Sequence, residues 1–208
     1  FQRRKNVLSY DDVMNQQRTI IYKQRQEVLE GGSLRNKIIS MIEETIADSV
    51  SQFLHEDDMT LWDMASLKAK YMGLLCREED FNELGSDAPK VREEIKNTLL
   101  ERAMTIYEDK EKNVFGEENF REVERVVLLR NVDQKWMDHL EAMDSLMETI
   151  GLQAYAQRNP LSEYRIVGAD LFDEMVMMIR DDTVRMILSV MPREQIKRVE
   201  VAKPVSAG

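Results

Sequence analysis

Few side chains in this sequence have the types and the spacing that catalysis or metal binding requires. The two histidines, His55 and His139, lie far apart and lack the spacing of metal ligands. Cys76 is the single cysteine and has no C-x-x-C partner, which excludes an internal disulfide and favours a reducing compartment. His139 is therefore predicted to be a surface histidine on a helix, and Cys76 to take no part in catalysis.

Two acidic runs and a glycine pair are the other candidates. Residues 56–58 and 78–80 are acidic, but neither run has the glycine and the twelve-residue frame of a calcium loop, so both are interpreted as solvated surface. Gly31 and Gly32 are not followed by the lysine of a phosphate-binding loop, and the chain has no dinucleotide fingerprint. The sequence thus predicts no catalytic, metal or cofactor site in this chain.

The composition is that of a folded acidic protein. The 208 residues are 43% hydrophobic and 33% charged, with a net charge of −10, which suits one or two domains with a sizeable core. The acidic balance opposes sequence-independent binding of DNA or RNA, which depends on Lys and Arg at the phosphates. No apolar run approaches the roughly 20 residues of a membrane-spanning helix, and the start does not resemble a signal peptide.

Glycine and proline are scarce, at eight and four residues, so long helices are expected. Apolar spacing predicts helices over residues 10–30, 33–54 and 89–112, with less regular structure over 55–87. Residues 31–116, whose net charge is −7, are predicted to form a small helical domain. Residues 193–208 lose the helical periodicity and are expected to be a mobile tail.

The clearest pattern lies in residues 117–192, which are predicted to be two long helices over 117–150 and 160–191. Apolar residues recur at helical spacing in each helix, by steps of three or four in the first, as on a face that packs against a neighbour. They are Val132, Trp136, Leu140, Met143, Met147 and Ile150 in the first helix, and Tyr164, Leu171, Phe172, Met175, Ile179, Met186 and Val190 in the second. Asn159 and Pro160 suit the start of the second helix, and the short connection predicts an antiparallel hairpin. Gly168 allows a kink or a break in the second helix.

The connection of this hairpin, residues 151–159, contains an aromatic side chain that could contact a partner. At 1.5 Å per residue, a helix over 117–150 is about 50 Å long, so Tyr155 would lie at the end of a long lever. Alternatively, Leu152 and Tyr155 fold back and seal the end of the hairpin. The pattern favours neither alternative.

Three strings of residues resemble the SecA family of ATP-driven preprotein translocases. Residues 10–18, preceded by Arg4 and Lys5, resemble the start of the family's scaffold helix, and residues 135–144 and 154–164 resemble its two-helix finger. The resemblance covers roughly residues 1–190 in the same order, although 31–116 match the family's wing domain chiefly by position. Near the tip, the run before Ala154 has neither the histidine nor the arginine that is usual in the family.

The resemblance implies an all-α fold, with a long scaffold helix, an antiparallel two-helix finger and an inserted small helical wing domain. The implied ranges are 1–30 for the first part of the scaffold, 31–116 for the wing, 117–192 for scaffold and finger, and 193–208 for a flexible tail. Two groups of side chains would contact partners. These are Tyr10, Asp11, Asn15 and Arg18, toward the motor domains, and Leu152, Gln153, Tyr155 and Gln157, toward the substrate at the fingertip.

The resemblance also implies that this chain is a non-catalytic part of an ATPase. ATP and magnesium would bind only in motor domains that are missing here. The partners would be the SecYEG channel, unfolded preprotein, and the motor and preprotein-binding domains of the same protein. The protein would be located in the cytoplasm, peripherally at the inner face of the cell membrane. Nucleic acid would not be among its partners. The residues alone leave two alternatives, a free-standing helical adaptor and an accessory domain that acts on nucleic acid.

Overall fold

A computed structural model describes residues 2–31, 34–153 and 159–193, and in these ranges it contains helices and no strand. This confirms the all-α prediction. The α-helices in these ranges are α1 (Gln2–Leu29), α2 (Leu34–Phe53), α3 (Met64–Tyr71), α4 (Ala88–Asp109), α5 (Glu117–Gln153) and α6 (Pro160–Ser189). Two short elements accompany them, the 3-10 turn η1 (Met59–Leu61) and the π-helical turn η2 (Lys110–Val114). The predicted mobile tail lies, from residue 194 on, outside the described residues.

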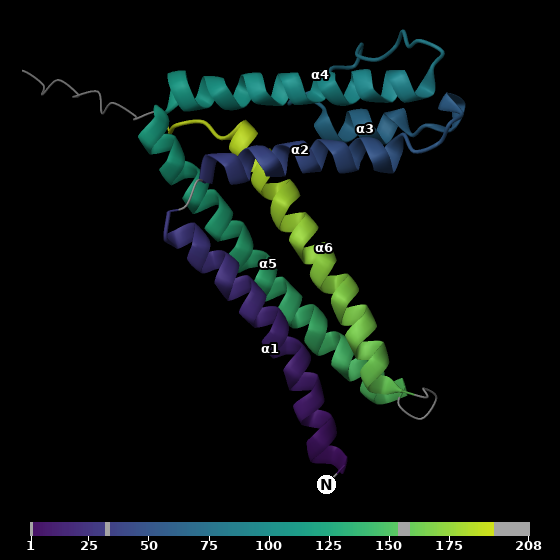
Figure 1. The fold of residues 1–208 in the computed structure, drawn as a ribbon, viewed down its shortest axis with the longest axis vertical. Helices are drawn as coiled ribbons and strands as arrows, with labels where there is room; N and C mark the ends of the chain where they lie inside the picture. Colours follow the sequence, from purple (N-terminus) through teal and green to yellow (C-terminus); the bar gives the residue numbers. More distant parts are fainter. Residues whose placement is uncertain (1, 32–33, 154–158, 194–208) are drawn as a thin grey trace, which may run out of the picture.

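The helices form two groups in space (Figure 1). α2, α3 and α4 lie together across one end, while α1, α5 and α6 run diagonally away from them. α5 and α6 are neighbours of opposite direction along most of their lengths, which confirms the predicted hairpin. α1 lies against both hairpin helices, and α6 passes beside α2 before it ends.

One apolar core joins the two groups where they meet. Ile42 and Ile46 of α2, Leu99 of α4 and Ile187 of α6 are all completely buried in it. Burying one such side chain stabilises a fold by about 1.5–3 kcal/mol. A second, smaller cluster lies along the distal half of the hairpin and comprises Met143, Ile150 and Tyr164. The hairpin is thus held by packing both near its base and farther out.

Several helix limits differ from the prediction. α1 begins at Gln2 rather than near residue 10, because the polar start of the chain continues the same helix without a glycine or a proline to stop it. α6 runs unbroken through Gly168, so the break that this glycine would allow does not occur. α4 begins as expected: the Asp87 side chain accepts from the Lys90 N–H at 3.3 Å, and Pro89 follows in the first turn.

The predicted apolar faces of the hairpin are confirmed except at two methionines. Met147 and Met186 are 38% and 37% exposed. Leu146 packs into the smaller cluster in place of Met147. Near its end α6 contacts α2 and α4 as well as α5, so that Ile187 and Leu188 are buried instead of Met186. A helix with several neighbours buries more than the single stripe that a two-helix pairing predicts.

Asp80 links the loop after α3 to α4, so the interpretation of residues 78–80 as solvated surface is wrong for this residue. Its carboxylate accepts hydrogen bonds from Arg102 Nη2 at 3.1 Å and from the Arg77 backbone N–H at 2.8 Å. The Arg102 guanidinium, followed by the Arg77 N–H, lowers the pKa of Asp80 to about 2. A lowered pKa means that the interaction stabilises the fold above the ordinary aspartate pKa and is lost as the pH falls toward the folded value.

We expect Asp80→Asn to lower the free energy of unfolding by about 1–2 kcal/mol at neutral pH, because the variant loses a charge-assisted hydrogen bond that is partly screened by solvent. The difference from the unchanged protein should shrink as the pH falls from about 5 to about 3. Urea unfolding followed by circular dichroism across this range measures it. The exposed Asp57→Asn is the matched control. A difference that does not change with pH would contradict the role of the ionised Asp80 carboxylate.

Candidate functional site

The end of the α5–α6 hairpin is the candidate site predicted from the sequence. Leu152, in the last turn of α5, is 85% exposed, so it does not fold back to seal the hairpin. Asn159 caps α6, where its side chain accepts from the Ser162 N–H at 3.2 Å. Tyr155 and Gln157 lie outside the described residues, as does the side chain of Gln153. The structure therefore shows the two helices, α5 and α6, that lead into the tip. It also shows that the apolar side chain of Leu152, beside the tip, points to solvent.

The four residues predicted to contact motor domains lie on α1 and divide into two groups. Asp11, Asn15 and Arg18 are exposed, and Arg18 donates to the Asn15 side chain at 3.2 Å. Tyr10 is half-buried and faces inward, where its ring meets that of Tyr164 edge to face at 4.9 Å. Tyr10 thus fixes the hairpin to α1, while the three polar side chains remain available to a partner.

Farther along α1, Gln17 makes polar contact with both helices of the hairpin. Its Oε1 lies 2.6 Å from His139 Nε2 on α5, and its Nε2 donates to the Gly168 carbonyl on α6 at 3.0 Å. The sequence analysis did not single out this contact. His139 is only 4% exposed, so the prediction of a surface histidine is wrong. His139 lies three residues after Trp136 and four before Met143, which is the spacing of the buried face of α5. This spacing is the sequence signal that could have predicted its burial.

The His139 ring is enclosed by aromatic side chains. Its centroid lies 5.5 Å from that of Trp136 and 5.8 Å from that of Phe172 on α6. Burial lowers the pKa of His139, so the neutral imidazole is favoured. A neutral ring in an apolar enclosure with a satisfied hydrogen bond is a structural contact rather than an acid or a base.

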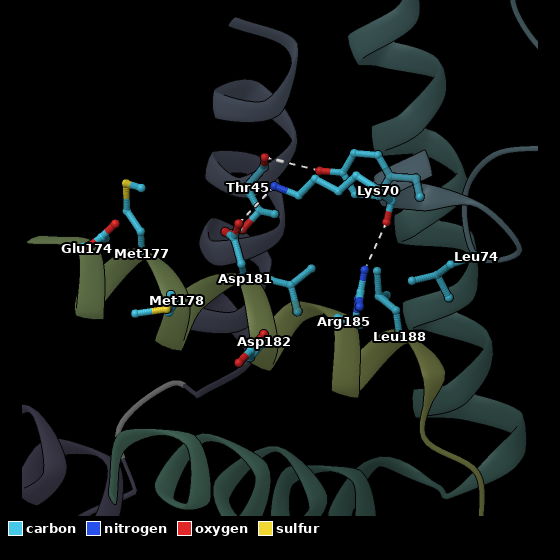
Figure 2. Close-up of a pocket in the computed structure, with 12 residues that line it drawn as sticks. Thr45, Lys70, Leu74, Glu174, Met177, Met178, Asp181, Asp182, Arg185 and Leu188 are labelled. Carbon is cyan, nitrogen blue, oxygen red and sulfur yellow. Dashed lines mark hydrogen bonds and ion pairs between the residues drawn. The ribbon is translucent and has the colours of Figure 1, made fainter. Parts of the chain in front are cut away.

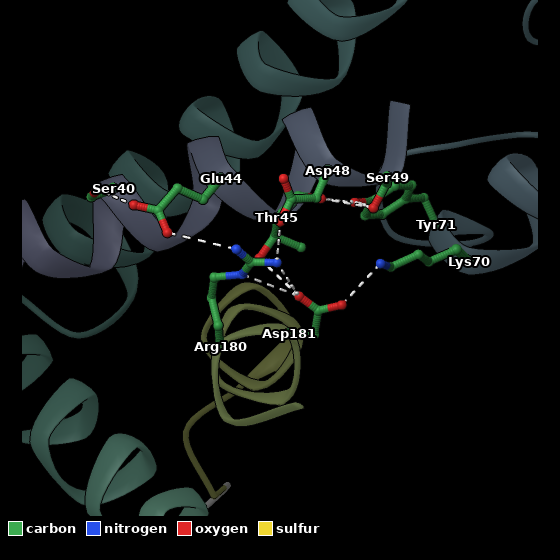
Figure 3. Close-up of polar contacts among 9 residues, drawn as sticks. All are labelled: Ser40, Glu44, Thr45, Asp48, Ser49, Lys70, Tyr71, Arg180 and Asp181. Carbon is green, nitrogen blue, oxygen red and sulfur yellow. Dashed lines mark hydrogen bonds and ion pairs between the residues drawn. The ribbon is translucent and has the colours of Figure 1, made fainter. Parts of the chain in front are cut away.

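A second polar contact joins α6 to α2 and α3 (Figure 3). Arg180 reaches α2, where its Nη2 pairs with Asp48 at 2.7 Å. The adjacent Asp181 accepts from Lys70 of α3 at 3.0 Å and from Thr45 of α2 at 3.2 Å. The Arg180 side chain is 15% exposed, whereas that of Asp48 is 60% exposed, so water reaches this network from the α2 side. The ionic contact links the hairpin to the α2–α4 group.

A pocket of about 410 Å³ opens beside this network, between α6 and the α2–α3 pair (Figure 2). The Asp181 carboxylate of α6 faces the Lys70 side chain, and Arg185 donates to the Lys70 carbonyl at 3.3 Å. Methionines 177 and 178 form part of its apolar wall. Lys70 is paired with Asp181 at 3.0 Å, and the Thr45 hydroxyl donates to the same carboxylate, so these polar groups of the lining are engaged in the contact between the helices. The pocket therefore has the character of a packing gap at a polar joint.

Buried charges gather where α4 passes through η2 into α5. Glu111 and Glu124 are 4% and 0% exposed, and Arg121 pairs with both carboxylates. Arg35 of α2 also pairs with Glu111, at 3.0 Å, and the Tyr107 hydroxyl donates to Glu124. Burial raises the pKa of Glu124, although the Tyr107 hydroxyl and Arg121 oppose the shift. No sequence pattern predicts this cluster, because its members come from four elements, α2, α4, η2 and α5.

The same junction holds the end of α6. Lys110, the first residue of η2, is 6% exposed and donates to the Val190 carbonyl at 2.6 Å. Burial lowers the pKa of this lysine. The base of the hairpin is therefore fixed on both sides, since α5 begins at the junction and α6 ends against it.

These contacts hold the helices of the chain against one another. Across residues 9–31, 34–152 and 159–193, no three side chains of His, Cys, Asp or Glu come close enough together to hold a metal ion. In the part of the chain that the structure describes, no helix combines the length and the apolar character needed to cross a membrane. What the geometry does provide is a long hairpin supported at its base, along its side and against the α2–α4 group.

Comparison with known proteins gives one consistent result. The family described as "SecA Wing and Scaffold domain" matches residues 1–191. The chain is 41% identical over 207 residues to the protein translocase subunit SecA of Clostridium botulinum, with 100% of the chain and 25% of that relative covered. It is 39% identical to the Finegoldia magna protein of the same name, with 98% and 22% covered, and 42% identical to that of Desulforamulus reducens, with 95% and 23% covered.

The chain thus spans about a quarter of the length of the curated relatives that it matches. The family match runs through all six described α-helices, from the start of α1 to the end of α6. Both the sequence and the helical architecture therefore agree with the resemblance found in the residues, and the chain belongs to the SecA family as a wing and scaffold region.

Proposed function

We propose that this chain couples movement of the motor domains of a SecA translocase to the pushing of preprotein through the SecYEG channel, and that it regulates ATP hydrolysis. The observation that carries the proposal is the α5–α6 hairpin, which is supported over its length while Leu152 at its far end is exposed. A long, braced pair of helices can transmit a displacement from its base to its tip. This suits a mechanical part better than a catalytic one.

The proposal assigns a contact to each end of this region. Asp11, Asn15 and Arg18, which are exposed on α1, would meet the motor and preprotein-binding domains. Leu152, Gln153, Tyr155 and Gln157 would contact unfolded preprotein, since an apolar or aromatic tip can grip varied sequences without a specific partner group. Residues 1–30 would act as scaffold, 31–116 as wing and 117–192 as scaffold and finger, with 193–208 as tail.

ATP and magnesium would bind in motor domains outside this segment, so ATP hydrolysis would not be a property of these residues alone. The place of action would be the cytoplasmic face of the cell membrane, in peripheral contact through the SecYEG channel. The net charge of −10 opposes a nucleic-acid partner. A free-standing helical adaptor is not favoured, because the whole chain aligns within longer SecA proteins.

We expect Tyr155→Ala, in a full-length SecA that contains this segment, to reduce preprotein translocation about tenfold while basal ATP hydrolysis changes less than about twofold. The physical reason is that the tip would lose its aromatic grip on the moving chain, whereas the motors would be untouched. Transport of a labelled preprotein into SecYEG vesicles and phosphate release measure the two quantities.

Two matched variants sharpen this test. Tyr155→Phe keeps the ring and should retain most of the transport. Leu61→Ala removes a side chain that is 65% exposed at the far end of the α2–α4 group, and it should change neither quantity. Equal loss of transport and ATP hydrolysis in Tyr155→Ala would show that Tyr155 is structural and would contradict its proposed role.

A further inference from the structure

Gln17 is the buried polar residue through which α1 reaches both hairpin helices. It is 7% exposed, one helical turn before the buried Ile21, so its carboxamide lies inside the three-helix contact. Each polar atom of this group contacts a different helix, α5 through Oε1 and α6 through Nε2. One short side chain therefore joins three helices.

The chemistry of the three groups fixes the direction of both hydrogen bonds. The Gly168 carbonyl can only accept, so the Gln17 amide nitrogen must face it and donate. The Gln17 oxygen is then left for His139, and since an amide oxygen can only accept, His139 Nε2 must be protonated and donate. The amide cannot be flipped, because its oxygen would then face the Gly168 carbonyl and two acceptors would be set against each other.

Gly168 lies where the three helices meet, and a side chain there would have to displace the end of Met143. A Cβ atom at this position would lie 2.8 Å from Met143 Cε on α5 and 3.9 Å from Gln17 Nε2 on α1. The absence of a side chain thus exposes a helix carbonyl to a donor from a neighbouring helix. This accounts for a glycine inside α6, which continues unbroken through this position.

We propose that Gln17 is a positioning residue that fixes the axial register of both hairpin helices on α1. A planar amide with two short, fixed bonds is satisfied at one relative height of the helices, and a slide by one residue, about 1.5 Å, breaks both bonds. The ionic contact between α6 and the α2–α3 pair does not fix the register in this way. Its long side chains, Arg180 and Lys70, can keep their partners when one helix slides past another. The inference rests on the proposed function, in which the hairpin transmits a displacement.

The test is Gln17→Met in a full-length SecA that contains this segment, since methionine keeps the length and loses both hydrogen bonds. We expect the amount of preprotein transported per ATP hydrolysed to fall about tenfold, with ATP hydrolysis itself changed less than about twofold. A purely structural role would lower both together with thermal stability. Gln17→Asn, which keeps the amide but cannot span the same distance, should show the same uncoupling if the methionine variant does not fold. Gln16→Met, at the exposed neighbouring position, is the matched control and should retain coupling.

A distance measurement between spin labels reports directly on the axial register of α6 relative to α1. Spin labels at Lys23 on α1 and Asp170 on α6, both exposed, give a distance distribution in a cysteine-free background that includes Cys76→Ala. The distribution should be narrow in the parent protein and broad in Gln17→Met. A narrow distribution with unchanged coupling would overturn the inference. Tyr155→Ala measured in parallel separates the two proposals: if it impairs transport while Gln17→Met does not, the register role of Gln17 is wrong and the proposed function stands.

Discussion

Replacing Arg121 by methionine is expected to lower the free energy of unfolding by about 3–5 kcal/mol, because two buried carboxylates lose the cation that they share. Glu111 and Glu124 are 4% and 0% exposed, so water cannot replace the guanidinium. Arg35 still pairs with Glu111 in the variant, whereas Glu124 keeps only a hydroxyl donor at contact distance, from Tyr107. Urea unfolding followed by circular dichroism at neutral pH measures the change.

The matched control is Arg125→Met, one turn later on the same helix. Arg125 pairs with Glu122, whose side chain is 60% exposed, so the expected loss is only about 0–1 kcal/mol. The Arg121 variant should also recover part of its stability as the pH falls below neutral, because burial already raises the pKa of Glu124 and its protonation removes the unpaired charge. Losses of the same size in the two variants would show that burial of the charge cluster contributes little.

Tyr164→Ala is expected to lower the free energy of unfolding by about 3–5 kcal/mol, the range for truncating a large buried aromatic side chain. Tyr164 is 1% exposed and forms the distal cluster with Met143 and Ile150, and its ring meets Tyr10 of α1 at 4.9 Å. Its loss should free the first turns of α6 from α1 while the α2–α4 group stays intact. Hydrogen exchange should therefore accelerate in α6 near Tyr164 and remain slow in α2.

Ile166→Ala gives the comparison on the same helix. Ile166 lies two residues after Tyr164 but is 62% exposed, so its truncation should change stability by less than about 0.5 kcal/mol. Acceleration of exchange throughout α2 and α4 in the Tyr164 variant would contradict the independence of the distal cluster, because it would show that the whole structure unfolds as one unit.

The helices themselves could be predicted from local pattern. The three- and four-residue spacing from Val132 to Ile150 predicted α5, and Asn159 with Pro160 predicted the start of α6 to the residue. These signals are local, because capping groups and apolar stripes act within one or two turns of a helix. The antiparallel hairpin followed from them, since two long stripes joined by a short connection must cover each other.

Contacts between distant residues could not be predicted in this way. Gln17 and His139 are 122 positions apart, and Gln17 and Gly168 are 151 apart. Whether a polar side chain at such a position is solvated or buried depends on the angle at which its helix meets the next. The exposed histidine expected at position 139 was wrong for this reason.

The sequence by itself therefore determined the helical class, the hairpin and the family, because each is carried by short-range periodicity or by strings of adjacent residues. The tertiary structure alone decided which polar groups are buried, among them Gln17, Glu111 and Glu124, and which helices they join. The physical reason is that burial of a polar group is tolerated only where a partner from another helix satisfies it, and that partner is set by packing rather than by sequence neighbours.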